Sequence, residues 1–168
     1  MAEIIEARRA AVVRNDGEYR LVTNQPVPAR TLLFTLEGEL TVTPTRYTVQ
    51  LDASRHVDMP GGCPLEEVLD RYYWRFMNHS CEPTAVIRER SVLSLRPIPA
   101  WSEITFHYAS TEYDMAEPFT CQCGGERCDG VIQGFRHVPR ERREGLRALL
   151  SPYLLAVLDG RIAEPVGV

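Results

Sequence analysis

The stretch "RFMNHSCEP", residues 75–83, is the most informative part of this sequence. It places an amide, an imidazole, a hydroxyl and a thiol in four consecutive residues, Asn78 to Cys81, directly after an aromatic run. Three interpretations are open: a nucleophile site around Cys81, a metal site, or a polar turn. The other cysteines, and the elements on either side of the stretch, bear on the choice.

The sequence around this stretch predicts short strands. Segments rich in β-branched and aromatic residues alternate with Gly, Pro and an Asp-Gly pair, which is typical of strands joined by tight turns. Residues 64–76 differ, because Pro64 suits the first position of a helix and apolar residues follow at helical spacing. The expected fold class is mainly β, or α+β by content, with strands at 10–15, 18–23, 31–42, 46–51, 84–89, 91–96 and 103–108.

The C-terminal part, from Pro139 onward, is predicted to be helical. Ser151-Pro152 has the pattern of a helix cap followed by a first helical residue, so a kink or two short helices are expected. The arginines of "FRHVPRERREGLR" (135–147) are interpreted as a solvated helix face. One apolar stripe can pack on its own domain or on a second copy of the chain; it consists of Leu146, Leu149, Leu150, Tyr153, Leu154, Val157 and Leu158.

Composition narrows the class of protein. With 168 residues, of which 44% are hydrophobic, the chain is long enough for one soluble domain with a core. A net charge of −4 argues against direct nucleic-acid binding, which usually shows as a basic face. The start "MAEIIEARRA" has no signal-peptide pattern, and the longest apolar stretch, residues 149–158, is about half of what a bilayer needs. A cytoplasmic protein without a membrane segment is expected.

All 19 basic residues are arginine. GC-rich codon usage is the ordinary explanation, and it implies no function. The absence of lysine nevertheless excludes enzymes that hold a cofactor as a lysine Schiff base, as well as P-loop enzymes.

The cysteines favour a metal site. Their number is five, which is odd, and in a chain without a secretion signal this argues against a disulfide framework. "CQCGGERC" (121–128) spaces Cys121, Cys123 and Cys128 as C-x-C-x4-C, and Gly124-Gly125 lets the backbone fold back. The spacing indicates zinc, although three reduced loop thiols without metal are an alternative. A tetrahedral site needs a fourth ligand, and the candidates are Cys63, Cys81, His56, His79, His107 and His137.

Three motifs in the same order, "RFMNHSCEP", "EITFHY" (103–108) and "CQCGGERC", resemble the SET-domain family of protein-lysine methyltransferases with its post-SET zinc motif. The resemblance covers residues 8–135. It implies a SET-type fold of short β-sheets with a knot-like crossing, and a C-terminal helical tail beyond it. The implied division is a SET domain at 8–118, a post-SET zinc-binding segment at 119–135 and the tail at 136–168.

The resemblance also implies the cofactors, S-adenosylmethionine and Zn²⁺. Cys81 would be the fourth zinc ligand, beside Cys121, Cys123 and Cys128. Asn78 and His79 would bind S-adenosylmethionine, largely through backbone groups and the Asn78 amide. The same cofactor pocket would also be lined by Arg75, Phe76, Tyr19 and Val131, the last standing where the family often has an aromatic residue over the adenine.

By the same likeness Tyr108 would orient the methyl group and the amine, and Phe106 would wall the lysine channel. Methyl transfer from a sulfonium to an amine is an in-line displacement that needs a neutral amine and little competing water. It requires no nucleophilic side chain, so the lack of a Ser/His/Asp arrangement is no objection. A phenylalanine at position 106 implies room for more than one methyl group.

The sequence departs from the family pattern at two places. Where the family has a Gly-x-Gly loop this chain has Glu18-Tyr19-Arg20, with a glycine only at Gly17, and close backbone approach is costly without glycine. His107 replaces the usual acidic residue before the tyrosine, and a structural role is expected for it. Cys63, in "PGGCP", is expected to be a free loop thiol.

Two functions follow. The first is methylation of a lysine in a protein or peptide, with S-adenosylmethionine as methyl donor. The second, motivated by the altered 18–20 loop, is a SET scaffold that has lost lysine methylation and serves as a binding module or acts on a small molecule. No nucleic-acid or membrane partner is expected, and an oligomer through the tail is possible.

Overall fold

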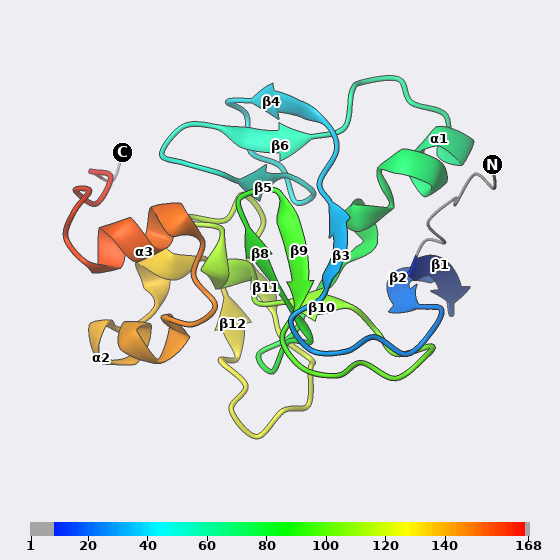
Figure 1. Ribbon diagram of the computed structural model, residues 1–168. Helices are drawn as coiled ribbons and strands as arrows, with labels where there is room; N and C mark the ends of the chain where they lie inside the picture. Colours follow the sequence, from blue (N-terminus) through cyan, green and yellow to red (C-terminus); the bar gives the residue numbers. More distant parts are fainter. Residues whose placement is uncertain (1–8, 167–168) are drawn as a thin grey trace, which may run out of the picture.

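The computed structural model describes residues 9–166, so most of the opening segment that was expected to lack a signal peptide lies outside the described part. Several small sheets, rather than one large sheet, make up most of the described chain, and short helices lie on opposite sides of them (Figure 1). Two of these sheets have three strands and three have two. The mainly β class expected from the sequence is confirmed, and none of the described helices has the length and apolar character needed to cross a bilayer.

The first sheet is a hairpin of β1 (Ala10–Asn15) and β2 (Glu18–Thr23), with the bounds that the sequence predicted. Asp16 and Gly17 both have positive φ, 50° and 84°, which is the conformation of a two-residue hairpin turn that matches the twist of its strands. The pairing is antiparallel throughout, and Val22 makes an additional bridge to Glu103. The hairpin is thereby joined to the strand segment that precedes Phe106.

Two three-stranded sheets occupy the centre. One has the order β3 (Leu32–Thr35), β9 (Ser91–Ser94), β8 (Ala85–Arg88), and the other β4 (Glu39–Thr41), β6 (His56–Asp58), β5 (Val49–Gln50). The single strand expected at 31–42 is wrong, because the chain changes sheets at Gly38. This glycine has φ +149°, and a Cβ added there would lie 2.1 Å from the Asp58 carbonyl oxygen. A glycine therefore allows the chain to pass close to β6 just before it pairs with that strand as β4.

The predicted helix at 64–76 is present in two pieces. Helix α1 (Leu65–Arg71) is followed by a 3₁₀ turn at Tyr73–Phe76, and Pro64 is the cap residue before the helix. The change of helix type turns Trp74 into the core, where its indole nitrogen donates a hydrogen bond to the Glu37 carbonyl over 2.9 Å. Tertiary packing of this side chain thus overrides the helical periodicity.

Two segments that are distant in sequence form a parallel pair. Strand β7 (Asn78–His79) lies beside β10 (Thr105–Phe106), with Asn78 opposite Thr105 and His79 opposite Phe106. The expected strand at 103–108 is shorter than predicted, because the chain enters a 3₁₀ turn at Tyr108–Ser110. This pairing brings the polar box of residues 78–81 next to Tyr108.

The remaining elements belong to the last third of the chain. Strands β11 (Phe119–Thr120) and β12 (Val131–Ile132) pair antiparallel and enclose the cysteine loop. A 3₁₀ turn at Phe135–His137, α2 (Arg140–Arg143), a 3₁₀ turn at Glu144–Leu146 and α3 (Pro152–Leu158) follow. The Ser151 hydroxyl accepts a hydrogen bond from the Leu154 amide, so the predicted cap is confirmed.

The tail packs on its own chain. Phe135, Leu150, Tyr153, Leu154 and Val157 are buried in one cluster together with Tyr113, which leaves this stripe covered without a second copy. The solvated arginine face is confirmed for most of its members, but Arg143 is buried. Its guanidinium lies over the Phe135 ring at 4.6 Å, donates to the carbonyls of Arg136 and Val138, and pairs with Glu164.

Candidate functional site

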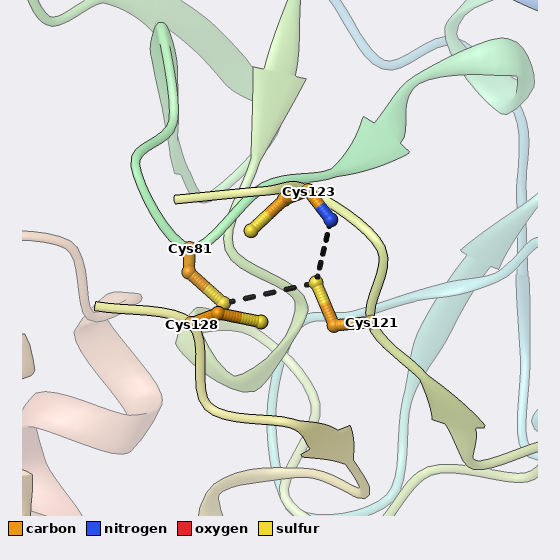
Figure 2. Close-up of side chains that lie close together, drawn as sticks. All are labelled: Cys81, Cys121, Cys123 and Cys128. Carbon is orange, nitrogen blue, oxygen red and sulfur yellow. Dashed lines mark hydrogen bonds between the residues drawn. The ribbon is translucent and has the colours of Figure 1, made fainter. Parts of the chain in front are cut away.

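The four cysteines expected to bind zinc lie together (Figure 2). Their sulfur atoms are all within 4.8 Å of one another, and Cys81 approaches Cys121 at 3.9 Å between the two sulfurs. Cys63 is a free thiol elsewhere, which donates to the Pro60 carbonyl. Four convergent sulfurs from two distant segments are the donor set of a closed tetrahedral zinc site.

The protonation of this cluster depends on whether a cation is bound. Burial raises the pKa of the Cys81 thiol and raises that of Cys121 to about 11, whereas backbone N–H donation, first from Gly125, lowers that of Cys123 to about 7. Without a positive charge at their centre, two of these thiols would stay protonated at neutral pH. A bound Zn²⁺ would hold all four as thiolates, and its role there would be structural.

His79 connects the cysteine cluster to Tyr108. The Tyr108 backbone N–H donates to His79 Nδ1 over 3.1 Å, so the ring proton is on Nε2, which lies 3.2 Å from the Cys81 sulfur. Burial, together with His107, lowers the pKa of His79 to about 3, which keeps the ring neutral. The imidazole therefore bridges two segments, and only backbone groups of His79 are left for a cofactor.

Asn78, Tyr19 and Phe76 converge at the edge of the β1–β2 hairpin. The Asn78 amide nitrogen donates to Glu103 over 2.8 Å and lies 3.5 Å from the Tyr19 carbonyl, while the Tyr19 and Phe76 rings are 4.8 Å apart. Two aromatic rings and an oriented amide are suited to a ligand such as S-adenosylmethionine. Val131, on β12, is 53% exposed and therefore open to a ligand.

Arg75 takes a different position from its neighbour Phe76. Its guanidinium lies over the Tyr47 ring at 4.3 Å and 3.9 Å from an Asp58 carboxylate oxygen. It faces a cavity that Phe106 and Tyr108 also line, so the structure does not bring Arg75 to the rings of Tyr19 and Phe76. Successive residues of the 3₁₀ turn point in different directions, which the sequence motif alone does not reveal.

The cavity beside Tyr108 is the second part of the site. Aromatic side chains form part of its wall, with the Phe106 and Tyr108 rings 4.7 Å apart and Trp74 and Tyr47 also in the lining. The Tyr108 hydroxyl donates to the Met77 carbonyl over 2.8 Å, and burial raises its pKa, so it remains protonated. An aromatic wall with a fixed hydroxyl is suited to an alkyl chain that ends in an amine.

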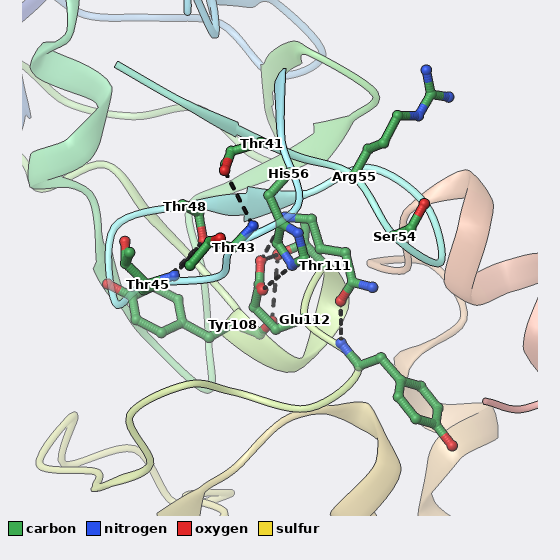
Figure 3. Close-up of polar contacts among 12 residues, drawn as sticks. Thr41, Thr43, Thr45, Thr48, Ser54, Arg55, His56, Tyr108, Thr111 and Glu112 are labelled. Carbon is green, nitrogen blue, oxygen red and sulfur yellow. Dashed lines mark hydrogen bonds and ion pairs between the residues drawn. The ribbon is translucent and has the colours of Figure 1, made fainter. Parts of the chain in front are cut away.

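Glu112 was missed by the sequence reasoning. It lines the cavity of Tyr108, and its carboxylate lies among side chains and backbone of β5 and β6 (Figure 3). In the sequence it is one of several acidic residues after Tyr108 with no motif around it, so no signal could have found it. His56, considered only as a zinc ligand, lies beside it.

His107 has the structural surroundings that were expected. It is 2% exposed, and its Nε2 is 3.0 Å from Asp129, which also pairs with Arg142 of the tail. His107, Asp129 and Val131 line a second cavity against the tail. The residue thus connects β10 to the cysteine loop and to α2.

Comparison with known proteins gives a family and a fold. The model of the SET domain family matches residues 4–109. Methyltransferase flvH of Aspergillus flavus is 37% identical over 90 residues, which cover 51% of this chain and 49% of that protein. Histone-lysine N-methyltransferase ash1 of Drosophila melanogaster is 28% identical over 134 residues, covering 71% of this chain and 6% of that protein.

Among solved structures, KRYPTONITE in complex with mCHG DNA and SAH is similar, with a TM-score of 0.54 and 19% sequence identity. The similarity covers 73% of this chain and 28% of KRYPTONITE, and it shows that the two chains share a fold. This chain spans about half the length of flvH and a small part of ash1.

Proposed function

Because this chain belongs to the SET domain family of S-adenosylmethionine-dependent methyltransferases, we propose that it methylates a lysine side chain of a protein or peptide. The SET-type fold expected from the sequence is confirmed by the structural similarity to KRYPTONITE. The lysine specificity is the step beyond family membership. It is supported by similarity to histone-lysine methyltransferases such as ash1, and by the aromatic cavity at Tyr108.

The observation that carries this proposal is the parallel pairing of Asn78-His79 with Thr105-Phe106. The pairing puts Tyr108 directly after the strand that lies beside the polar box. A ligand held at Asn78 would then lie next to a cavity that receives the amine. Methyl transfer needs this arrangement, because donor and acceptor must meet in line while water is kept out.

The residue roles belong to the same proposal. Asn78, the backbone of His79, Tyr19 and Phe76 would hold S-adenosylmethionine, which supplies the methyl group. Val131 would cover part of it, and Arg75 is reassigned to the wall of the amine cavity because of its contact with Tyr47. Phe106 would shape the channel, and the Tyr108 hydroxyl, fixed by Met77, would orient the amine.

Zinc would hold the post-SET loop in place. The Cys81 sulfur accepts hydrogen bonds from the Asp129 backbone N–H, over 3.3 Å, and from the His79 ring N–H. The position of this sulfur therefore fixes the cysteine loop directly and the Tyr108 backbone through His79. We therefore propose a structural rather than a catalytic zinc, and expect its loss to displace His79.

The substrate and the surroundings of the protein are inferred more coarsely. The names of ash1 and its relatives refer to histones, which makes core histones the first protein substrate to try. DNA is present in the KRYPTONITE complex, but only 28% of that chain is covered, so our expectation of no direct nucleic-acid binding stays a prediction. A cytoplasmic location is likewise a prediction.

A methyl-transfer assay tests the proposal. Zinc-loaded protein is incubated with S-adenosylmethionine carrying a radioactive methyl group and with core histones or free L-lysine, and the products are hydrolysed and separated. Labelled methyl-lysine released from histones is the expected result. Label found only on free lysine would favour the small-molecule alternative, and no binding of S-adenosylmethionine up to about millimolar concentration would contradict both enzymatic functions.

A further inference from the structure

A lysine amine must lose a proton before it can be methylated. The ordinary pKa of a lysine ammonium is about 10.4, so only about one amine in 2,500 is neutral at pH 7. The lone pair that attacks the methyl carbon is occupied by that proton. A methyltransferase of the kind proposed above therefore gains rate from a group that accepts the proton inside the amine cavity.

The cavity beside Tyr108 offers few candidates for this acceptor. Its described lining includes two carboxylates, of which Glu117 is exposed and lies 3.6 Å from the Arg46 guanidinium, while Glu112 is only 8% exposed. Tyr108 holds its own proton in the hydrogen bond to Met77. Arg46 and Arg75 are permanent cations and accept no proton.

The contacts of Glu112 leave one oxygen available. Oε1 accepts from the Gln50 backbone N–H over 2.8 Å and from the Thr111 hydroxyl over 3.2 Å. Oε2 lies 3.8 Å from His56 Nε2, which is longer than a hydrogen bond (Figure 3). One oxygen is thus anchored to β5 and the adjacent threonine, and the other has capacity for a proton.

We infer that Glu112 is the proton acceptor of the methyl-transfer reaction, an inference that rests on the proposed function. An N–H bond of the substrate ammonium breaks and an O–H bond forms on Glu112, directly or through one water. The amine nitrogen then bonds to the methyl carbon, and the carbon–sulfur bond breaks with its electron pair remaining on sulfur. The proton leaves Glu112 for water when the product departs.

The electrostatic surroundings suit this role. Burial raises the pKa of Glu112 to about 7, although the Gln50 and Thr111 donors oppose the rise. Burial lowers the pKa of His56, which faces it from β6, so that ring is neutral. Tyr108 is neutral as well, and the charged groups Arg46, Arg75 and Glu117 line the same cavity. A base that titrates near the working pH is the most effective proton acceptor.

A purely structural role for Glu112 makes a different prediction. Its bonds to Gln50 and Thr111 join β5 to the turn after Tyr108, and their loss would lower activity equally at every pH. A proton acceptor is needed only while the amine is protonated. The two roles therefore differ in how the loss of activity in Glu112→Gln changes with pH.

The test compares wild type, Glu112→Gln and the control Glu66→Gln in single-turnover methylation of core histones and of L-lysine from pH 6 to 10; Glu66 is an exposed residue of α1 and does not line the cavity. The wild-type rate is expected to rise with a midpoint near pH 7 and to reach its plateau above it. Glu112→Gln should be slower by about 100-fold at pH 7, with the deficit shrinking about tenfold per pH unit above it. Glu66→Gln should follow the wild type, and calorimetry should give all three the same affinity for S-adenosylmethionine.

A deficit of Glu112→Gln that is absent, or constant with pH, would overturn the inference while an active wild type upholds the proposed function. A wild type inactive on both probes would contradict the proposed function itself. A second measurement does not depend on the activity of a variant. Carbon NMR of protein labelled in its glutamate carboxyls follows the titration of each carboxyl directly. One carboxyl titrating near pH 7 is expected, and its absence from the wild type would overturn the inference even if Glu112→Gln fails to fold.

Discussion

The stability of the protein should depend on the charge of Glu112, and Glu112→Gln isolates this dependence. The ordinary pKa of a glutamate is 4.5, and burial raises that of Glu112 to about 7 in the folded chain. Between these values the unfolded chain has released this proton while the folded chain retains it. Stability therefore falls as pH rises through this window, and the contribution is fully lost above pH 7. Glutamine keeps the oxygen that accepts from Gln50 and carries no charge.

The magnitude follows from the two pKa values. The interval from 4.5 to about 7, at about 1.4 kcal/mol per pH unit, corresponds to about 3 kcal/mol of destabilisation above pH 7. Between pH 5 and pH 8 we expect about 2 kcal/mol of this destabilisation, after allowing for relaxation of the structure around the buried carboxylate.

Urea unfolding of the zinc-loaded wild type and Glu112→Gln at pH 5 and pH 8 measures this quantity. The difference in unfolding free energy between the two proteins should move by about 2 kcal/mol in favour of the variant at pH 8, because only the wild type carries the buried charge. All other titrating groups are shared and cancel. An identical difference at both pH values would refute the reasoning, since it would mean that Glu112 titrates like an exposed carboxyl.

Two further predictions concern the metal and the fold. Cys123→Ser should lower the zinc content, measured by elemental analysis, from one per chain to well below one, because a closed site needs four ligands; Cys63→Ser should retain one zinc, and an unchanged content in Cys123→Ser would contradict the site. Gly38→Ala should cost at least about 2 kcal/mol in urea unfolding, because its Cβ would overlap the Asp58 carbonyl oxygen, whereas Gly61→Ala has open space and should change stability by less than about 0.5 kcal/mol. Equal effects of the two substitutions would show that Gly38 does not lie against β6 as described.

Local features of the fold were predictable from the sequence. The β1–β2 hairpin follows from Asp16-Gly17, whose conformations are intrinsic to those residue types, and the start of α3 follows from Ser151-Pro152. The break at Gly38 was not predictable, since its cause is the approach of Asp58 from another strand. Periodicity describes one segment at a time and carries no information about such approaches.

The site was predictable only in part for the same reason. Spacing alone indicated three zinc ligands, and the resemblance to a family was needed to choose Cys81. Cys81 lies 40 residues before Cys121 and approaches it only in the folded chain. Arg143 and Glu112 are charged residues that the fold buries with specific partners, and nothing in their neighbouring sequence distinguishes them from solvated ones.

The central claim is that Tyr108 serves methyl transfer to an amine at the junction of β7 and β10. The most direct measurement is the transfer of a labelled methyl group from S-adenosylmethionine to histone lysines by wild type and Tyr108→Phe, with cofactor affinity determined for both. Removing the hydroxyl leaves the ring contact with Phe106 in place, so the account predicts unchanged affinity and a loss of transfer of at least about 100-fold. Equal transfer by the two proteins would contradict it.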